Sequence, residues 1–307
     1  MKITLFGTFL IPFFCVTIAT QSSGQNATPA PASVPASVAT APSTPSQTKS
    51  YGLISVPEII PGILAGYLQQ GALPNSLALI PPAPTRGTAV YALDEAVSRA
   101  NLALQGSPRW EQATSDADLS FPHVAGTFSC SLGIPITETE TPHLYMLLRR
   151  SFTDAALSTY AAKNHYNRSR PFAENKHPSC TPQDEAFLRK DGSYPSGHTA
   201  IGWAWALILT EIAPTQTDAI LARGRSFGDS RLVCNVHWQS DVNEGRIMGA
   251  AIVARLHADP AFRADLDAAK ADYEVAHAKE LKPTRDCAAE AAALATPSAA
   301  VTNPAVH

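Results

Sequence analysis

Charged residues are scarce in this sequence, and so are long hydrophobic runs beyond its first twenty residues. Only 16% of the 307 residues are charged and the net charge is -3, which argues against a general binder of nucleic acid or anionic membranes. No apolar run in the body of the chain is long enough to span a bilayer. We therefore expect no nucleic-acid partner and no stable membrane association, and any anion site must be a local cluster of cations.

Sequence motifs for nucleotides and metals are also missing. The chain has no Gly-x-x-x-x-Gly-Lys loop, no Cys-x-x-Cys pair and no acidic metal cluster. These absences exclude a P-loop and argue against a zinc or magnesium centre. We expect no metal and no other cofactor, so a bound phosphate would be held by side chains and backbone groups.

The N-terminus reads as an export signal. Lys2 is followed by an uncharged apolar run to Ala19, and then by small polar residues where a peptidase could cut. The alternative is an uncleaved membrane anchor, which Pro12 disfavours because it weakens a spanning helix. We predict a signal peptide at residues 1–22, a disordered Ala/Pro/Ser linker at 23–51, and a periplasmic or secreted product.

Export would leave four cysteines in the mature chain: Cys130, Cys180, Cys234 and Cys287. An even number in an oxidising compartment permits two disulfides. Three pairings are possible, and the spacing does not choose among them. Four free buried thiols are the alternative.

What the chain does have is apolar residues at helical spacing. Hydrophobic residues make up 45% of the sequence, and few segments alternate between apolar and polar residues. The pattern predicts a single all-α domain at residues 52–281 and a flexible tail at 282–307. Thr141 and Thr181 each precede a proline and are expected to cap the helices that follow. The other expected helices lie at 89–104, 200–209, 247–256 and 260–281.

The segment from Ser230 to Asp241 contains a candidate nucleophile. His237 and Asp241 are four residues apart, so both project from one face if the segment is helical. The carboxylate would then fix the imidazole tautomer and leave the other ring nitrogen free to attack. Arg231 lies close enough to grip an oxyanion. A plain hydrogen bond on a helix surface is the alternative.

Two further segments supply cations and donors. Lys163 and Arg170 are seven residues apart and lie on one side if their helix persists, whereas Arg168 fits an ordinary basic helix end better. Ser196 and Gly197 open a helix, where unpaired backbone amides favour an anion, and His198 stands at the mouth of that site. Together these groups would bind a tetrahedral dianion.

Three spaced motifs carry a family resemblance. They are Lys163-x6-Arg170-Pro171, Pro195-Ser-Gly-His198 and Ser230-Arg231-x5-His237-x3-Asp241. In this order they resemble the signature of the type-2 phosphatidic-acid-phosphatase (PAP2) superfamily, and within it the secreted class A bacterial non-specific acid phosphatases. The likeness covers roughly residues 67–276. The chain departs from the pattern at Asn235, where glycine is usual.

The resemblance implies a helical bundle of the PAP2 and vanadium-haloperoxidase type, often a homo-oligomer, that hydrolyses small phosphate monoesters. His237 would attack phosphorus, with Asp241 orienting it, and His198 would protonate the leaving alcohol. The transferring oxygens would be neutralised by Lys163, Arg170, Arg231 and the Ser196 and Gly197 amides. An acidic optimum is expected because His198 must be protonated while His237 is not.

Two other functions remain open at this point. A vanadate-dependent haloperoxidase could use a similar site, and a non-catalytic exported phosphate-binding protein could use the same cations. The second would not need two histidines and an orienting carboxylate. The preferred phosphoester and the size of any oligomer have no readable signature in the sequence.

Overall fold

Helices form most of the residues that the computed structural model describes, residues 55–299. The predicted signal peptide and linker lie outside this range. The longer helices are α2 (Ala89–Asn101), α3 (Pro108–Ala117), α5 (Pro142–Ser158), α6 (Tyr160–Tyr166), α9 (Gly197–Ile212), α10 (Thr217–Val233), α11 (Gln239–Leu256), α12 (Pro260–Ala278) and α13 (Cys287–Leu294). The shorter ones are α1 (Ser76–Leu79), α4 (Ser129–Leu132), α7 (Pro171–Asn175) and α8 (Glu185–Leu188). The all-α prediction is confirmed.

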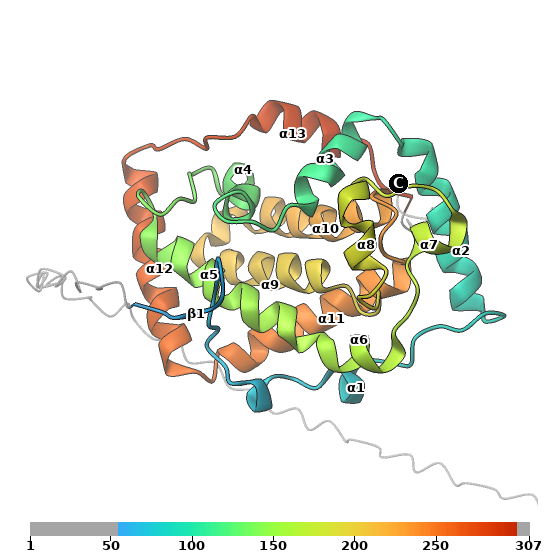
Figure 1. Cartoon of the computed structure of the whole chain (residues 1–307). Helices are drawn as coiled ribbons and strands as arrows, with labels where there is room; N and C mark the ends of the chain where they lie inside the picture. The colour runs from blue at the N-terminus through green and yellow to red at the C-terminus, as the bar shows by residue number, and fades with distance from the viewer. Residues whose placement is uncertain (1–54, 300–307) are drawn as a thin grey trace, which may run out of the picture. The chain divides into compact units, whose positions relative to one another are not determined.

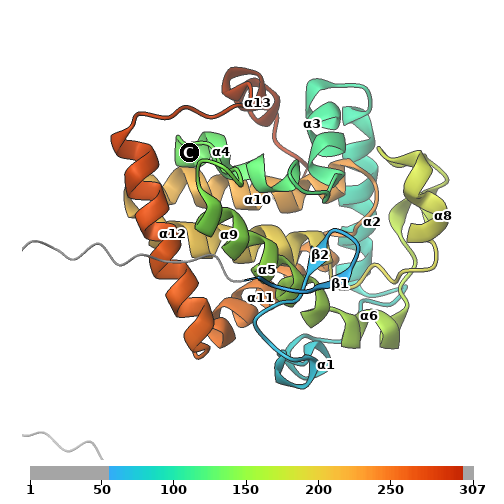
Figure 2. The ribbon, with the colours of Figure 1, turned by 60° about the vertical axis from the view of Figure 1, so that its left-hand side comes forward.

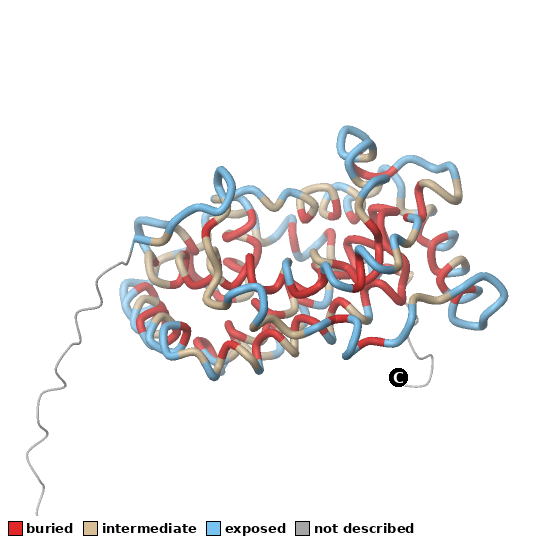
Figure 3. Tube along the Cα trace, turned by 60° about the horizontal axis from the view of Figure 1, so that its bottom comes forward, coloured by how far each residue is buried: buried red, intermediate tan, exposed pale blue. Residues whose placement is uncertain are grey.

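The fold is organised around α9, which is apolar on nearly every face and is therefore buried. It packs against α10, α11 and α5, and Figure 1 shows it between α10 and α11. Trp205, at 0% exposure, lies at the centre of the main hydrophobic cluster. In Figure 3 the buried residues face inward along these helices. Within residues 55–299, no helix combines the length and apolar character needed to cross a bilayer.

Glycines let two of these helices approach α9 closely. A Cβ at Gly202 would lie 2.2 Å from the Phe227 ring of α10, and a Cβ at Gly245 of α11 would lie 2.6 Å from the Ser196 carbonyl oxygen. Neither position has room for a side chain. The second contact holds the start of α11 against the start of α9, which brings two of the sequence motifs together.

The expected threonine caps are absent, although helices begin at the predicted places. The Thr141 hydroxyl donates to the Pro135 carbonyl, and no side-chain cap is present at Thr181. The first amides of α5 donate instead to the Asp272 carboxylate of α12, with His143 N at 2.6 Å. A carboxylate from a distant helix therefore satisfies the α5 N-terminus, and local sequence does not reveal such a partner.

A short antiparallel hairpin, absent from the sequence prediction, precedes the helices. Its strands are β1 (Glu58–Ile60) and β2 (Ile63–Leu64), and Gly62 takes a φ of 83° in the turn. The Thr153 hydroxyl of α5 donates to the Leu64 carbonyl at 2.7 Å. Figure 2 shows the hairpin lying beside α5. The strands are too short to stand out from the helical pattern of the sequence.

Two disulfides resolve the open question of cysteine pairing. Cys130 pairs with Cys287, and Cys180 pairs with Cys234. The first ties α13 to α4, so the prediction of a flexible tail does not hold for Cys287–Leu294. The second closes a separation of 54 residues and ties the segment before α8 to the end of α10, which restricts the unfolded chain and stabilises this corner of the fold.

Candidate active site

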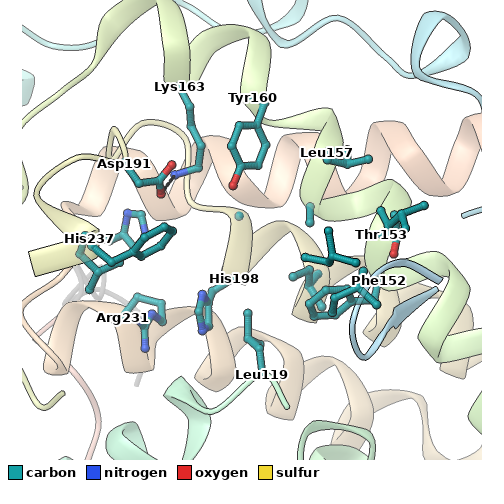
Figure 4. A pocket seen from close by; sticks show the side chains of 18 of the residues that line it. Leu119, Phe152, Thr153, Leu157, Tyr160, Lys163, Asp191, His198, Arg231 and His237 are labelled. Carbon is teal, nitrogen blue, oxygen red and sulfur yellow. Dashed lines mark hydrogen bonds and ion pairs between the residues drawn. The ribbon is translucent and has the colours of Figure 1, made fainter. Parts of the chain in front are cut away.

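The three sequence motifs meet at one cavity of about 290 Å³. Its lining includes Lys163, Arg170, Gly197, His198, Arg231 and His237, together with Asp191. Figure 4 shows Lys163, Asp191 and His237 at one end, with Arg231 and His198 beside them. Residues far apart in the sequence, from Lys163 to His237, thus converge on one pocket whose cations favour an anion.

His237 lies in the connection between α10 and α11, not in a helix. The chain leaves α10 after Val233 and turns at Asn235, whose φ of 62° suits asparagine better than most residues other than glycine. The helical condition for a shared face of His237 and Asp241 is not met, because α11 begins only at Gln239, although the expected contact between them is present. Asp241 instead reaches back from the first turn, accepting from the Trp238 amide at 2.8 Å.

The two ring nitrogens of His237, which lines the cavity, have partners of opposite charge. Nδ1 lies 3.2 Å from Asp241 Oδ2, and Nε2 lies 3.0 Å from Arg170 Nη1. Since a guanidinium only donates, Nε2 accepts and the proton belongs on Nδ1, facing the carboxylate. Burial, and then the charges of Arg170 and Lys163, lower the pKa of His237 well below its usual value. Nε2 is thus held unprotonated, with its lone pair accepting from Arg170.

Lys163 and Arg170 reach the cavity from separate elements. The helix does not persist from one to the other, because α6 ends at Tyr166 and Arg170 precedes α7, yet both line the same cavity. Asp191 Oδ2 lies 3.2 Å from Lys163 Nζ and 2.7 Å from Arg170 Nη2. Burial, and then the charge of Arg170, lower the pKa of Lys163 to about 8.

Arg231 is the least satisfied cation of the site. It is 2% exposed, and its Nε and Nη1 atoms have no hydrogen-bond partner within residues 55–299. Burial, and then the charge of Arg170, lower its pKa to about 9. A buried, unpaired guanidinium is costly for the fold. An anionic ligand in the cavity would offset that cost.

His198 projects from the first turn of α9 with one nitrogen already engaged. Its Nε2 lies 3.1 Å from the Ala117 carbonyl oxygen, and its ring stacks on Phe227. An Nε2–H donating to that carbonyl leaves Nδ1 for the cavity. Burial, and then the charge of Arg231, lower the pKa of His198 well below its usual value. The second histidine is therefore held in an orientation suited to proton exchange.

Comparison with known proteins agrees with this geometry. The model of the PAP2 superfamily matches residues 142–264. A non-specific acid phosphatase of Providencia stuartii is 45% identical over 208 residues, covering 67% of this chain and 84% of that protein. The chain belongs to the class A bacterial non-specific acid phosphatases of the PAP2 superfamily.

Two further relatives support the same assignment. An acid phosphatase of Zymomonas mobilis is 42% identical over 209 residues, covering 68% of this chain and 79% of that protein. A non-specific acid phosphatase of Salmonella typhimurium is 43% identical over 193 residues, covering 62% of this chain and 77% of that protein. The protein is a phosphatase acting on small phosphate monoesters, which decides against the haloperoxidase and binding-protein alternatives.

The two predicted amide donors of the phosphatase differ in their surroundings. Gly197 lines the cavity, whereas the Ser196 amide donates to the Asp241 carbonyl oxygen at 2.9 Å. The Ser196 hydroxyl caps α9 by accepting from the Thr199 amide at 3.2 Å. Ser196 thus joins the starts of α9 and α11 in this structure, and Gly197 is the better placed donor for a bound anion.

Sequence reasoning set aside one residue that the structure places against the carboxylate partner of His237. Arg168 donates to Asp241 Oδ1 and to Asp94 Oδ2, both at 2.7 Å. Asp94 of α2 also accepts from the Ser240 amide at 2.8 Å. Arg168 thereby holds the carboxylate that holds His237. The position of Arg168 inside the first motif could have indicated a role in the site. Its contact with Asp94 could not be predicted, because Asp94 lies far away in the sequence.

Proposed function

We propose that this phosphatase hydrolyses phosphate monoesters of broad range through a phosphohistidine on His237, without a metal ion. The Nε2 lone pair attacks phosphorus while the bond from phosphorus to the ester oxygen breaks. His198 Nδ1–H gives its proton to the departing alkoxide. Water then attacks the phosphohistidine and returns a proton to His198, which releases inorganic phosphate and regenerates Nε2.

The observation that carries the proposal is the chain of contacts through His237. Asp241 accepts from Nδ1 at 3.2 Å and stabilises the charge that develops on the ring when Nε2 bonds to phosphorus. Arg170, 3.0 Å from Nε2, lies where it donates to a phosphoryl oxygen once phosphorus approaches that nitrogen. A protein that only binds phosphate gains nothing from holding one imidazole lone pair towards the ligand.

Charge in the empty site explains why the two histidines take different roles. Both pKa values are low because the rings are buried among cations. A bound dianion neutralises those cations, so it raises the pKa of His198 and favours its acid form. Asp241 meanwhile keeps the His237 proton on Nδ1. The substrate itself thus prepares the general acid, and an acidic optimum is expected.

A rapid-quench experiment tests the covalent intermediate. An aryl phosphate should give a burst of phenol equal to the enzyme concentration, together with acid-labile, base-stable phosphate on the protein. His237→Ala should abolish both and lower kcat by at least about 10⁴-fold. Near-normal turnover by folded His237→Ala would refute the nucleophile. Loss of wild-type activity in EDTA, restored by a divalent metal, would refute the metal-free route.

Export and self-association complete the proposal. The predicted signal peptide at residues 1–22 places the mature enzyme in the periplasm or outside the cell, where its two disulfides are stable. We expect it to form a homo-oligomer. Cell fractionation followed by N-terminal sequencing tests the first expectation, and sedimentation of the purified enzyme tests the second.

A further inference from the structure

The cavity continues outward from the phosphoryl-binding groups into an apolar part, which we call the outer end. Its walls come from the β1–β2 hairpin, α5, α6, α8, α9 and the segment after α3. The side chains are Ile59, Ile60, Ile63, Leu119, Phe152, Thr153, Ala156, Leu157, Tyr160, Phe187, Leu188 and Ile201. In Figure 4, Leu157, Thr153 and Phe152 lie at the end opposite Lys163 and Asp191.

The rim of the outer end exposes large apolar side chains to solvent. Ile59, Ile60, Leu157, Tyr160 and Phe187 are 51%, 61%, 41%, 39% and 66% exposed. They make up five of the eleven exposed large hydrophobic residues among residues 55–299. Because exposed apolar groups gathered around a cavity are typical of binding sites, this clustering indicates a ligand with apolar surface.

Polar groups able to bind an alcohol with many hydroxyls are scarce at the outer end. Of its lining side chains only Thr153 and Tyr160 carry a hydrogen-bonding atom. The Thr153 hydroxyl already donates to the Leu64 carbonyl at 2.7 Å. A sugar or glycerol group placed here would lose water and gain one hydroxyl partner at most, which is unfavourable. An alkyl or aryl group would lose only unfavourable hydration.

The position of the general acid decides which part of a substrate occupies this end. His198 lies between Arg231 and Leu119 in Figure 4, where the charged and apolar parts of the cavity meet. If His198 protonates the ester oxygen while phosphorus sits at His237, the carbon attached to that oxygen must point into the outer end. The occupant is therefore the alcohol part of the substrate.

We propose that the outer end selects phosphate monoesters of apolar alcohols, with Ile60 and Phe187 as specificity-determining residues. This inference rests on the proposed orientation of the ester between His237 and His198. Side chains of the hairpin and of α8 line the part of the cavity that would hold the alcohol, while the inner cations hold the phosphoryl group. Breadth towards many apolar alcohols follows, because apolar contact carries little directional demand.

A series of alkyl phosphates separates apolar binding from chemistry. Ethyl, butyl and hexyl phosphate have leaving alcohols of nearly equal acidity, so chemistry alone predicts equal rates. Each buried methylene should raise kcat/KM by up to about fourfold. We expect hexyl phosphate to exceed ethyl phosphate by about tenfold to one hundredfold. Glycerol 1-phosphate should be slower than hexyl phosphate by a similar factor, although glycerol is the better leaving group.

Variants at the rim assign the effect to the outer end. Ile60→Asn and Phe187→Ser change side chains that are more than half exposed, so both proteins should fold normally. Each should lower kcat/KM for hexyl phosphate about threefold to tenfold and leave ethyl phosphate within twofold of wild type. The matched control is Ile247→Asn on α11, 51% exposed and outside the cavity, which should change neither rate.

The outcomes keep this inference apart from the catalytic proposal. Equal rates across the alkyl series in wild type would overturn the apolar alcohol site while leaving the mechanism intact. A steep series that Ile60→Asn and Phe187→Ser do not flatten would overturn the assignment to these residues. If Phe187→Ser dissociated an oligomer without changing selectivity, the rim would be a subunit interface instead. Failure of the mechanism itself would show as turnover of ethyl phosphate by His237→Ala.

Discussion

Two arginines on α10 occupy equally buried positions and have opposite surroundings. Arg223 is 3% exposed and binds Asp116 with two hydrogen bonds, of 2.6 and 3.2 Å, while its Nε lies 3.3 Å from Glu290. Arg231, two turns later, is 2% exposed and has two nitrogens without a partner among the described residues. The same residue type, on the same helix, forms ion pairs with carboxylates in one place and forms none with the described residues in the other.

Their pKa values show the consequence of that difference. Burial lowers the pKa of Arg223, but Asp116 and Glu290 outweigh burial and raise it above the usual value. For Arg231, burial and Arg170 together lower the pKa to about 9. A buried cation that is paired with carboxylates contributes to stability. A buried cation without such a partner is available to an anionic ligand. Arg223 thus belongs to the scaffold, whereas Arg231 has the surroundings expected of a cation that binds the phosphoryl group.

Replacing Arg231 tests the functional side of the comparison. Arg231→Ala should lower kcat/KM about 100-fold to 1000-fold, because a preorganised donor to the transferring oxygens is lost. The free energy of unfolding should stay the same or rise, since an unpaired buried cation is removed. Steady-state kinetics and urea unfolding of one preparation measure both. A large fall in stability with unchanged kinetics would reverse the roles of the two arginines.

Replacing Arg223 tests the structural side. Arg223→Met should lower the free energy of unfolding by about 3–5 kcal/mol, because the buried Asp116 carboxylate loses its ion pair and both guanidinium hydrogen bonds and keeps the neutral donors of Gln112 and Ser230. The kcat/KM per folded molecule should stay within about threefold of wild type. Adding Asp116→Leu should restore much of the stability. Loss of activity in the folded single variant would contradict the separation of scaffold and site.

The pH profile sharpens the comparison further. His198 must be protonated to act as an acid, so activity falls as the pH rises through its pKa, which lies below the usual value in the empty site because of burial and Arg231. A bound dianion raises that pKa, so the alkaline limb of kcat should lie at higher pH than that of kcat/KM. In Arg231→Ala the alkaline limb of the kcat/KM profile should also move to higher pH, because a cation that lowers the pKa of His198 is removed. Arg223→Met should leave this limb at the wild-type pH.

Removing the contact behind the nucleophile should have the smallest effect. Arg168→Met keeps the Asp241 contact to the Trp238 amide but loses the ion pairs to Asp241 and Asp94. We expect kcat to fall about tenfold, with KM nearly unchanged, because the carboxylate that orients His237 is held less firmly. Arg168→Lys should recover part of the loss. An equal fall for both variants would indicate that any change here simply disturbs packing.

Prediction from sequence succeeded where the signal was local. Helical spacing located α2, α5, α9, α11 and α12, because the apolar residues that each helix buries recur at regular intervals within that segment. The three motifs contain every Lys, Arg and His that lines the cavity, but they miss Asp191. They include Arg168, whose contact with Asp241 the sequence did not reveal. Prediction from sequence failed for Asp272 as the cap of α5 and for the β1–β2 hairpin beside the cavity, since both depend on contacts between distant segments.

The residue types of the site were determined by the sequence itself: two imidazoles, three cations and an orienting carboxylate at fixed spacing can serve a phosphoryl group. Tertiary structure alone decided which cations are available to a ligand. Other helices bring carboxylates to Arg223 and bring none into contact with Arg231 among the described residues. Tertiary structure also decided the apolar surroundings of the leaving group. Side-chain chemistry is local, whereas dielectric, pairing and cavity shape are properties of packed neighbours.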